Sequence, residues 1–297
     1  MSFQHDILAA TQSFNSNLHM LAQQQVSKLQ ECVNTQTVST KSEFFDRIGG
    51  IRMLPRTSRH QDTAFTPLPF SRRRVDILDY EVSDLIDQED IIKALINPQS
   101  ATVKRFVEAS NINMDKVIIA NLLGFATASD ADSAISNIAL PAGQKIANGA
   151  TNLNTTKIKD AVKILGNNDV DLASEEVYLA CNWNMYRVLL QTSEFINRDF
   201  KLGAPTEVTI KTLNEFLGVN IRIVTREVLP KTGNIGSAVL FTKPSCILGM
   251  NNQFSTKVLE DATKGGSLRV IGKQNLGAVR MEEERVVQID CDETAVS

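Results

Sequence analysis

The feature that most constrains the fold is a long amphipathic helix over residues 98–123, which has a start signal and a stop signal. Asn97 is a favourable N-cap, and Pro98 suits the first helical position, where its missing N–H costs nothing. Gly124 can close the helix as a C-terminal cap. Between them one apolar stripe recurs at three- and four-residue spacing, made of Val103, Phe106, Val107, Met114, Val117, Ile118 and Leu122. Such a helix is roughly 40 Å long, enough to run the full width of a domain.

The stretch from Ser42 to Glu81 cannot be one helix, because Pro55, Pro67 and Pro69 interrupt it. We predict two strands that flank a long excursion without core residues of its own. An excursion of this length is usually functional or packed on another chain. The sequence therefore predicts an extended arm.

The rest of the chain mixes helices with short strands. A glutamine-rich helix is expected over residues 3–30, lying on a surface or against a partner. Further helices are expected at 155–165, 182–192 and 208–218, and a hairpin or loop with weak strands at 125–153. Strands are expected at 175–181, 219–229, 237–242, 245–250, 256–261, 268–272 and 279–290, with a hairpin turn at Gly265–Gly266. This pattern predicts an α+β fold whose extended N-terminal region precedes the compact part.

Composition limits the broad class of the protein. The formal net charge of −3 gives no global reason to bind nucleic acid, which needs an excess of lysine and arginine. No apolar run is long enough to span a bilayer, and the N-terminus lacks a secretory pattern, so we expect a soluble, intracellular chain. The cysteines show no paired spacing and are read as reduced packing residues: Cys32, Cys181, Cys246 and Cys291.

Motifs for catalysis or metal binding fail on inspection. The histidines all lie in the part expected to be peripheral: His5, His19 and His60. Residues 167–171 begin like a calcium loop, but Leu172 replaces its glycine and Tyr178 its bidentate glutamate. Residues 271–274 invite a phosphate-loop reading, yet Ser267 stands where the upstream glycine is required. We therefore predict no catalytic, cofactor or metal site. An α+β enzyme stays as an alternative, which a ligand-sized pocket lined by perturbed carboxylates would support.

Positive charge is concentrated in the predicted arm, and negative charge follows at once. The residues that we expect to pair between head-to-tail subunits are Arg56, Arg59, Arg72, Arg73 and Arg74 with Asp84, Asp87, Glu89 and Asp90. The alternative is two unrelated solvated faces, since a surface ion pair contributes under roughly 1 kcal/mol.

DNA contact by the same arginines is the weaker hypothesis. Strand alternation sends Arg72 and Arg74 to one face and Arg73 to the other, and the acidic segment repels phosphate. Loose, non-specific DNA contact is instead expected from the long helix, at Lys104, Arg105 and Lys116.

Three segments resemble a known family. FTPLPFSRRRVDILDYEVSDLIDQEDIIKALINPQSATVKRFVEASNINMDKVIIANLLG resembles the region from the extended loop into the spine helix of tailed-phage major capsid proteins with the Hong Kong 97-type fold. The resemblance continues in LPAGQKIANGATNLNTTKIKDAVKILGNNDVD and QNLGAVRMEEERVVQIDCDE, and it covers most of residues 42–293.

The resemblance implies an order of parts. Residues 1–41 would be an N-terminal arm, 42–82 the extended loop, and 83–174 the peripheral domain with the spine helix at 98–123. Residues 175–270 would be the axial domain, and 271–297 the closing strand of the peripheral domain, around Val279 to Ile289, with the C-terminus.

The resemblance also implies a function and partners. The chain would self-assemble as hexamers and pentamers into an icosahedral shell around double-stranded DNA, in the virion capsid, after assembly in the host cytoplasm. A separate scaffolding protein, a portal protein and a cement protein are the expected partners, with no membrane and no cofactor. Covalent crosslinking is not expected, because no Lys–Asn pair is marked by the sequence. The alternative within this fold is an encapsulin-like compartment shell that encloses proteins.

Overall fold

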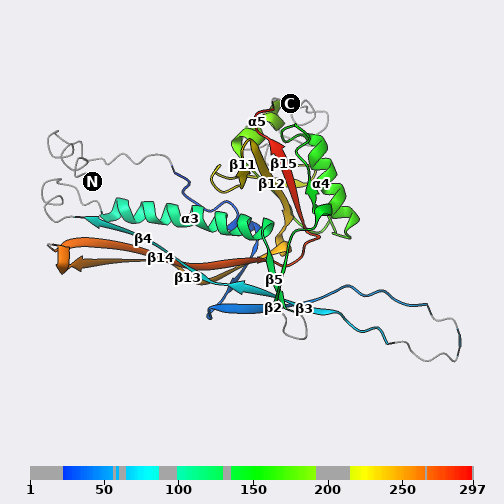
Figure 1. Cartoon of the computed structure of the whole chain (residues 1–297), viewed down its shortest axis with the longest axis horizontal. Coiled ribbons are helices and arrows are strands. Elements are labelled where there is room, and N and C mark those ends of the chain that lie inside the picture. Colours follow the sequence, from blue (N-terminus) through cyan, green and yellow to red (C-terminus); the bar gives the residue numbers. More distant parts are fainter. Residues whose placement is uncertain are drawn as a thin grey trace.

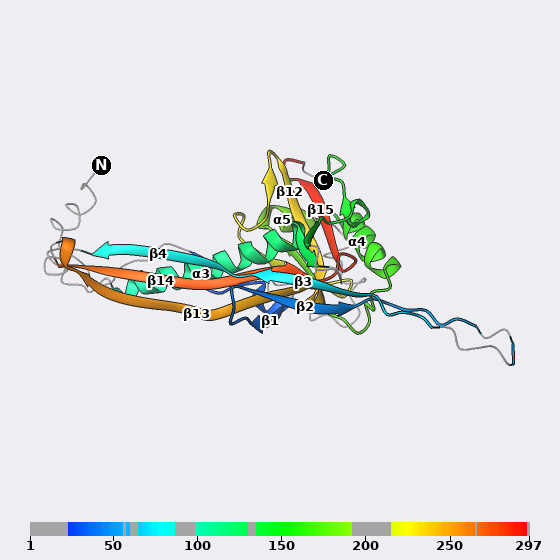
Figure 2. The same ribbon diagram turned by 60° about the horizontal axis from the view of Figure 1, so that its bottom comes forward.

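The computed structural model describes residues 23–55, 58–59, 65–86, 99–129, 135–191, 215–264 and 266–295. Several expectations lie outside these residues. They are most of the helix at 3–30, the cap at Asn97–Pro98, most of the helix at 208–218, and the charged residues Arg56, Asp87, Glu89 and Asp90. Figures 1 and 2 show an elongated body with a head near one end and a long loop that extends away from it.

The body is a helix laid along a sheet. Helix α3 (Gln99–Leu123) runs beside a four-stranded sheet of order β1-β13-β14-β4 (Figure 1). Its strands are β1 (Asn34–Thr37), β13 (Cys246–Asp261), β14 (Ser267–Arg280) and β4 (Leu78–Ile86). Most of the predicted apolar stripe is buried, although Val107 stays 39% exposed. The helix ends at Leu123 as predicted, but Gly124 does not adopt the positive φ of a left-handed glycine cap; its amide donates to the carbonyl of Ala120 at 2.8 Å, with ordinary helical spacing.

The head is a second sheet covered by two helices. Its order is β7-β15-β12-β8-β10-β9, with β11 paired to β12. The strands are β7 (Lys145–Ile146), β8 (Val177–Cys181), β9 (Glu215–Phe216), β10 (Val219–Ile223), β11 (Lys231–Thr232), β12 (Ile235–Thr242) and β15 (Val286–Asp292). Helices α4 (Thr155–Asn167) and α5 (Trp183–Gln191) confirm the helices expected at 155–165 and 182–192. One apolar cluster joins Ile118 and Leu122 of α3 to Leu179 and Leu240 of the head, so body and head share a core.

The third sheet holds the root of the extended loop. Its order is β2-β3-β5-β6, with β2 (Ser42–Ile48), β3 (Phe70–Asp76), β5 (Ala126–Ser129) and β6 (Ile135–Ile138). Strands β2 and β3 pair antiparallel along their full length, from Ser42 with Asp76 to Ile48 with Phe70. The two strands and the excursion between them are as predicted, and β5 with β6 confirms the weak hairpin.

Several boundaries differ from the expectations. Residues 23–29 form no α-helix, and only the 3₁₀ turn Gln30–Cys32 follows. The amides of Lys28 and Leu29 donate to a carboxylate of α3 instead of to backbone carbonyls. The strands expected at 245–250 and 256–261 are one strand, since β13 passes through Asn252 with two register shifts instead of a loop. Conversely, the strand expected at 279–290 is divided: β14 ends at Arg280 and β15 begins at Val286.

Candidate assembly surface and the junction beneath it

The extended loop exposes an apolar surface that its own chain does not cover. The exposed side chains on its strands and described limbs are Phe44, Ile48, Ile51, Met53, Leu54, Phe65, Leu68 and Phe70. Met53 is 100% exposed and Phe65 98%. Contiguous apolar surface of this kind on a folded chain marks a contact with another molecule.

The arginines at the root of the loop alternate between surface and interior. Arg72 pairs with Asp46 at 2.7 Å and Arg74 with Asp76 at 3.0 Å, both at the surface. Arg73 points the other way, is 1% exposed and has its partner within its own chain, so it leaves almost no surface for a neighbouring subunit. The alternation was predicted, whereas the burial of Arg73 was not.

The remaining described members of the predicted charge pairs lie apart. Arg59 is exposed on the loop, and Asp84 is exposed near the end of β4. In Figure 1 the end of β4 and the extended loop lie at opposite ends of the molecule. The loop of one chain therefore does not meet the Asp84 region of the same chain.

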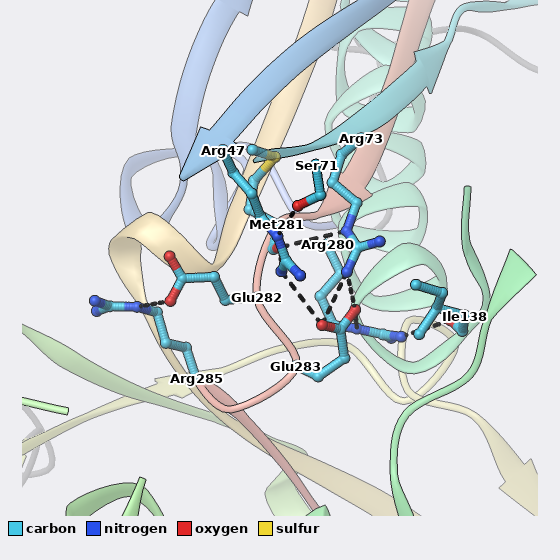
Figure 3. A network of polar contacts seen from close by, with 9 residues as sticks. All are labelled: Arg47, Ser71, Arg73, Ile138, Arg280, Met281, Glu282, Glu283 and Arg285. Carbon is cyan, nitrogen blue, oxygen red and sulfur yellow. Dashed lines mark hydrogen bonds and ion pairs between the residues drawn. The ribbon is translucent and has the colours of Figure 1, made fainter. Parts of the chain in front are cut away.

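Beneath the loop root, two arginines from the loop meet one glutamate. Arg73 donates from Nη2 to both oxygens of Glu283, at 2.7 and 2.9 Å (Figure 3). Arg47, from the paired strand β2, donates from Nη1 to the carbonyl of Met281 at 2.7 Å and reaches Glu283 at 3.4 Å. Its Nε donates to the hydroxyl of Ser71 at 2.8 Å. Both strands of the loop are thus bound to the turn between β14 and β15.

A third arginine binds the same turn to the body. Arg280 is fully buried, and its Nη1 donates to the carbonyls of Leu122 and Gly124 at 2.7 and 2.8 Å. These carbonyls end α3, where a cation is favourable. Its Nη2 donates to the carbonyl of Ile138, at the end of β6, at 2.9 Å (Figure 3). We call the cluster of Arg47, Arg73, Arg280 and Glu283 the junction.

A single carboxylate, Glu283, faces the three arginines of the junction. Burial lowers the pKa of Arg73 and of Arg280, and the charge of Glu283 opposes this shift in both cases. Arg280 Nε lies 3.8 Å from Glu283, which is close enough for an ion pair and too far for a hydrogen bond. Loss of Glu283 would leave buried cations without compensation, a change that typically costs about 3–5 kcal/mol.

Residues 7–293 match the family model described as phage capsid protein. The chain belongs to the phage capsid protein family. Its role is that of a major capsid protein, a structural shell subunit of the virion. A search of curated protein sequences finds no match.

Solved capsids share the fold of this capsid protein at low sequence identity. The capsid of Ralstonia phage GP4 matches with a TM-score of 0.73 and 10% identity, over 97% of this chain and 96% of that one. The capsid of cyanophage Pam1 gives 0.72 and 12%, over 96% of each chain. The capsid of cyanophage P-SCSP1u gives 0.71 and 16%, over 95% and 93%. The predicted α+β capsid fold is confirmed, and the Hong Kong 97-type assignment agrees with these matches.

A buried carboxylate attaches the N-terminal segment of the capsid protein to α3. Asp115 is fully buried and accepts five hydrogen bonds from residues 24–29, a segment that we call the strap. The donors are the side chains of Gln24 and Ser27, at 2.6 and 2.5 Å, and the amides of Lys28 and Leu29, at 3.0 to 3.2 Å. A carboxylate that satisfies backbone amides orders a segment that has no helix of its own.

The basic residues expected on α3 have different surroundings. Lys104 is exposed. Arg105 pairs with Glu108 at 2.9 Å, and Lys116 with Glu227 at 3.2 Å. A cation that is already paired with a carboxylate attracts a phosphate less strongly, so Lys104 is the strongest of the three candidates for DNA contact.

A cavity of about 590 Å³ lies between the strap and β10, and none of its lining residues is a carboxylate. Among the described residues, no three His, Cys, Asp or Glu side chains gather as metal ligands. Within the same residues, no helix combines the length and the hydropathy needed to cross a membrane.

Proposed function

We propose that this capsid protein forms an icosahedral shell of hexamers and pentamers around the double-stranded DNA of a tailed phage, with each extended loop lying on a neighbouring subunit. The observation that carries the proposal is the loop itself: an apolar limb held firmly at its root and uncovered along its length. A separate scaffolding protein, a portal protein, a cement protein and assembly in the host cytoplasm belong to the same proposal. So does the division into N-terminal arm, extended loop, peripheral domain and axial domain.

Apolar burial, more than charge, is expected to provide the contact energy. Full burial of a side chain such as Met53 or Phe65 contributes roughly 1.5–3 kcal/mol, while a surface ion pair contributes under about 1 kcal/mol. We therefore propose that the charge pairs fix how neighbouring subunits are aligned and oriented, while the apolar side chains provide most of the binding energy. Among the described residues, the pairs would use Arg59, Arg72 and Arg74 of one subunit and Asp84 of the next.

Electron microscopy of the purified chain, alone and with a scaffolding protein, tests the proposal. We expect closed particles that contain nucleic acid when they form in infected cells. The double variant Met53→Ser/Phe65→Ser should abolish closed particles, while Val258→Ser, which removes a 44% exposed side chain from β13, should keep them. Monomers in all wild-type preparations would refute shell formation, and closed particles from the loop variant would refute the loop contact.

The charge pairs need a separate test. Joint reversal of Arg72 and Arg74 to Glu should weaken assembly at low salt, and the difference from wild type should shrink at high salt, because screening removes the repulsion as well as the attraction. Unchanged assembly at both salt concentrations would refute the pairing. The family match is with phage capsid proteins and gives no support to an encapsulin-like compartment.

A further inference from the structure

The extended loop has a short backbone attachment to the rest of the chain. Strand β3 continues through Ile77 into β4 of the body sheet, and its lateral pairing with β5 is limited to Arg72 with Ser129 and Arg73 with Ala128. A small apolar cluster, which includes Val75 and Met281, packs beneath the root. Two ladder pairs fix the position of a hairpin better than its direction, because a strand can pivot about so short a ladder.

The side-chain contacts of the junction restrain the direction of the hairpin, which the short ladder does not. We propose that Glu283 is a positioning residue that fixes the direction in which the extended loop leaves the body, and that this direction sets the curvature of the shell. The second half of this statement rests on the proposed function, in which the loop contacts a neighbour. The first half concerns the single subunit and can be tested without assembly.

The geometry of the contacts carries the inference. Glu283 binds both strands of the loop, through Arg73 and Arg47, so a rotation of the hairpin must break at least one of these contacts. Arg73 binds through two nitrogens, because Nη2 donates to both carboxylate oxygens of Glu283 and Nε donates to the carbonyl of Met281 at 3.4 Å. Two separate nitrogens fix the orientation of the guanidinium as well as its distance. Both partners are almost fully enclosed, at 1% and 8% side-chain exposure, so water cannot easily replace them.

The other side of the junction connects the loop direction to the whole body. Glu283 lies in the turn between β14, a strand of the body sheet, and β15, a strand of the head sheet. Arg280 ties the same turn to the end of α3 and to β6. The direction of the loop is therefore set relative to body and head together (Figures 1 and 3).

A small rotation at the junction has a large effect at the tip. Each limb beyond Ile48 and Phe70 has about ten residues and spans roughly 30 Å when extended. A rotation of about 10° at the root then moves the tip by about 5 Å, which exceeds the roughly 4 Å range of an apolar contact. Loss of the junction should therefore let subunits close at mixed angles, or not close.

Distance measurement between two spin labels tests the direction of the loop in unassembled subunits. The labels are placed by Met53→Cys in the loop and Lys104→Cys on α3, and the four native cysteines do not compete because all are buried. We expect a narrow distance distribution for the wild-type background. Glu283→Gln and Arg73→Met should each broaden it about twofold or more, since the hairpin then populates several orientations. Arg73→Lys keeps the charge but lacks the planar fork, so it should recover part of the narrow distribution.

Lys157→Met is the control for general destabilisation. Lys157 is a buried cation of α4 that donates to the carbonyls of Asn148, Thr151 and Asp290, away from the loop. We expect this variant to lower stability and leave the label distance unchanged. Should the two strongest variants fail to fold, Arg47→Met, at the 30% exposed edge of the junction, gives the same comparison.

Two outcomes would overturn the positioning role: a wild-type distribution as broad as that of Arg73→Met, or narrow distributions in every junction variant. The effect on curvature is read separately, from particle diameters by electron microscopy. Broadened label distances with particles of wild-type diameter would overturn the link to curvature alone. Failure of wild-type subunits to form any shell would overturn the proposed function and leave the label result standing.

Discussion

Replacing Asp115 by Asn should release the strap from α3 while leaving the shape of the side chain almost unchanged. With the amide oxygen in the place of Oδ1, Ser27 and Leu29 keep an acceptor. The new NH₂ group then faces two donors, Gln24 and Lys28. Gln24 can turn its own amide to accept, whereas the backbone N–H of Lys28 cannot. The amide of Lys28 keeps only its longer bond, 3.2 Å to Oδ1, and faces another donor in the place of Oδ2. All the remaining bonds lose the assistance of the charge.

The magnitude follows from these contacts. A hydrogen bond to a charged group contributes about 1.5–3 kcal/mol and a neutral one about 0.5–1.5 kcal/mol, so the donors that lose the charge together lose a few kcal/mol. We therefore expect the strap to open about 3 kcal/mol more easily, which raises the open population about a hundredfold. Trypsin can report this population, because Lys28 lies within the strap and cleavage tracks the open form when closing is fast.

The assay compares the rate of tryptic cleavage after Lys28 in wild type, Asp115→Asn and Asp160→Asn. Asp160 is an exposed carboxylate of α4, so its variant controls for the loss of a negative charge. We expect a rate increase of about a hundredfold for Asp115→Asn and none for Asp160→Asn. Equal rates in all three proteins would show that the strap is held by other contacts and that the five hydrogen bonds to Asp115 contribute little.

Three further predictions concern the head, the body sheet and the thiols. Hydrogen bonds and charge from Lys231, with a hydrogen bond from Asn182, lower the pKa of Glu293 below its usual 4.5 even though burial acts in the opposite direction. The stability from this group is present above that pH and is lost as the pH falls. In Glu293→Gln, the unfolding free energy should therefore fall less steeply as the pH drops below about 4.5. The free energy is measured by urea unfolding at a series of pH values, and the same pH dependence in variant and wild type would contradict this. Gly277→Ala should destabilise the protein by about 1–3 kcal/mol or more in urea unfolding, because the added carbon would lie 2.0 Å from the carbonyl oxygen of Asp76. The control is Gly143→Ala, where the added carbon enters open space and stability should not change. Burial raises the pKa of Cys32 to about 11, so a thiol reagent at pH 8 should leave it unlabelled until denaturant is added, as it should the equally buried Cys181, Cys246 and Cys291.

Local signals gave the helices and the loop, because their causes lie close together in the sequence. Asn154 caps α4 by accepting a hydrogen bond from the amide of Lys157, and this capping pattern can be read directly from neighbouring residues. The end of α3 at Leu123 could likewise be predicted from a neighbouring residue, the glycine at position 124. The prolines between Ile48 and Phe70 likewise exclude a helix in the extended loop, and this can be predicted without the rest of the chain.

The junction could not be predicted, because its partners are far apart in the sequence. Arg73 and Glu283 are separated by 210 residues, and Arg280 and Leu122 by 158. Alternation along β3 indicated that Arg73 faces away from Arg72, but a buried arginine and an exposed one look the same in a strand pattern. The one available signal was a run of charged residues, from Glu282 to Arg285, directly after the apolar end of β14. That run surrounds the turn that holds the loop, but charge in the sequence does not distinguish a buried ion pair from a solvated surface.

The strap is a second case in which a distant residue determines the local structure. Its apolar spacing favoured a helix, yet a single carboxylate on α3, more than 80 residues away, accepts the amides of Lys28 and Leu29 that a helix would have used internally. Tertiary hydrogen bonds to a charged group outweighed a weak local preference.

The body consists of one helix laid along strands that all run in its long direction, and this has a mechanical consequence. Along that direction, tension is carried by the covalent backbones of the extended strands β4, β13 and β14. Across it, tension is carried only by the hydrogen bonds between strands and by side-chain packing, which are far weaker than covalent bonds. In the proposed shell, a wall built from such plates should be stiff along each plate and compliant across it. If that shell holds packed DNA, as we propose, cracks under its outward pressure should run parallel to the strands and leave the plates whole.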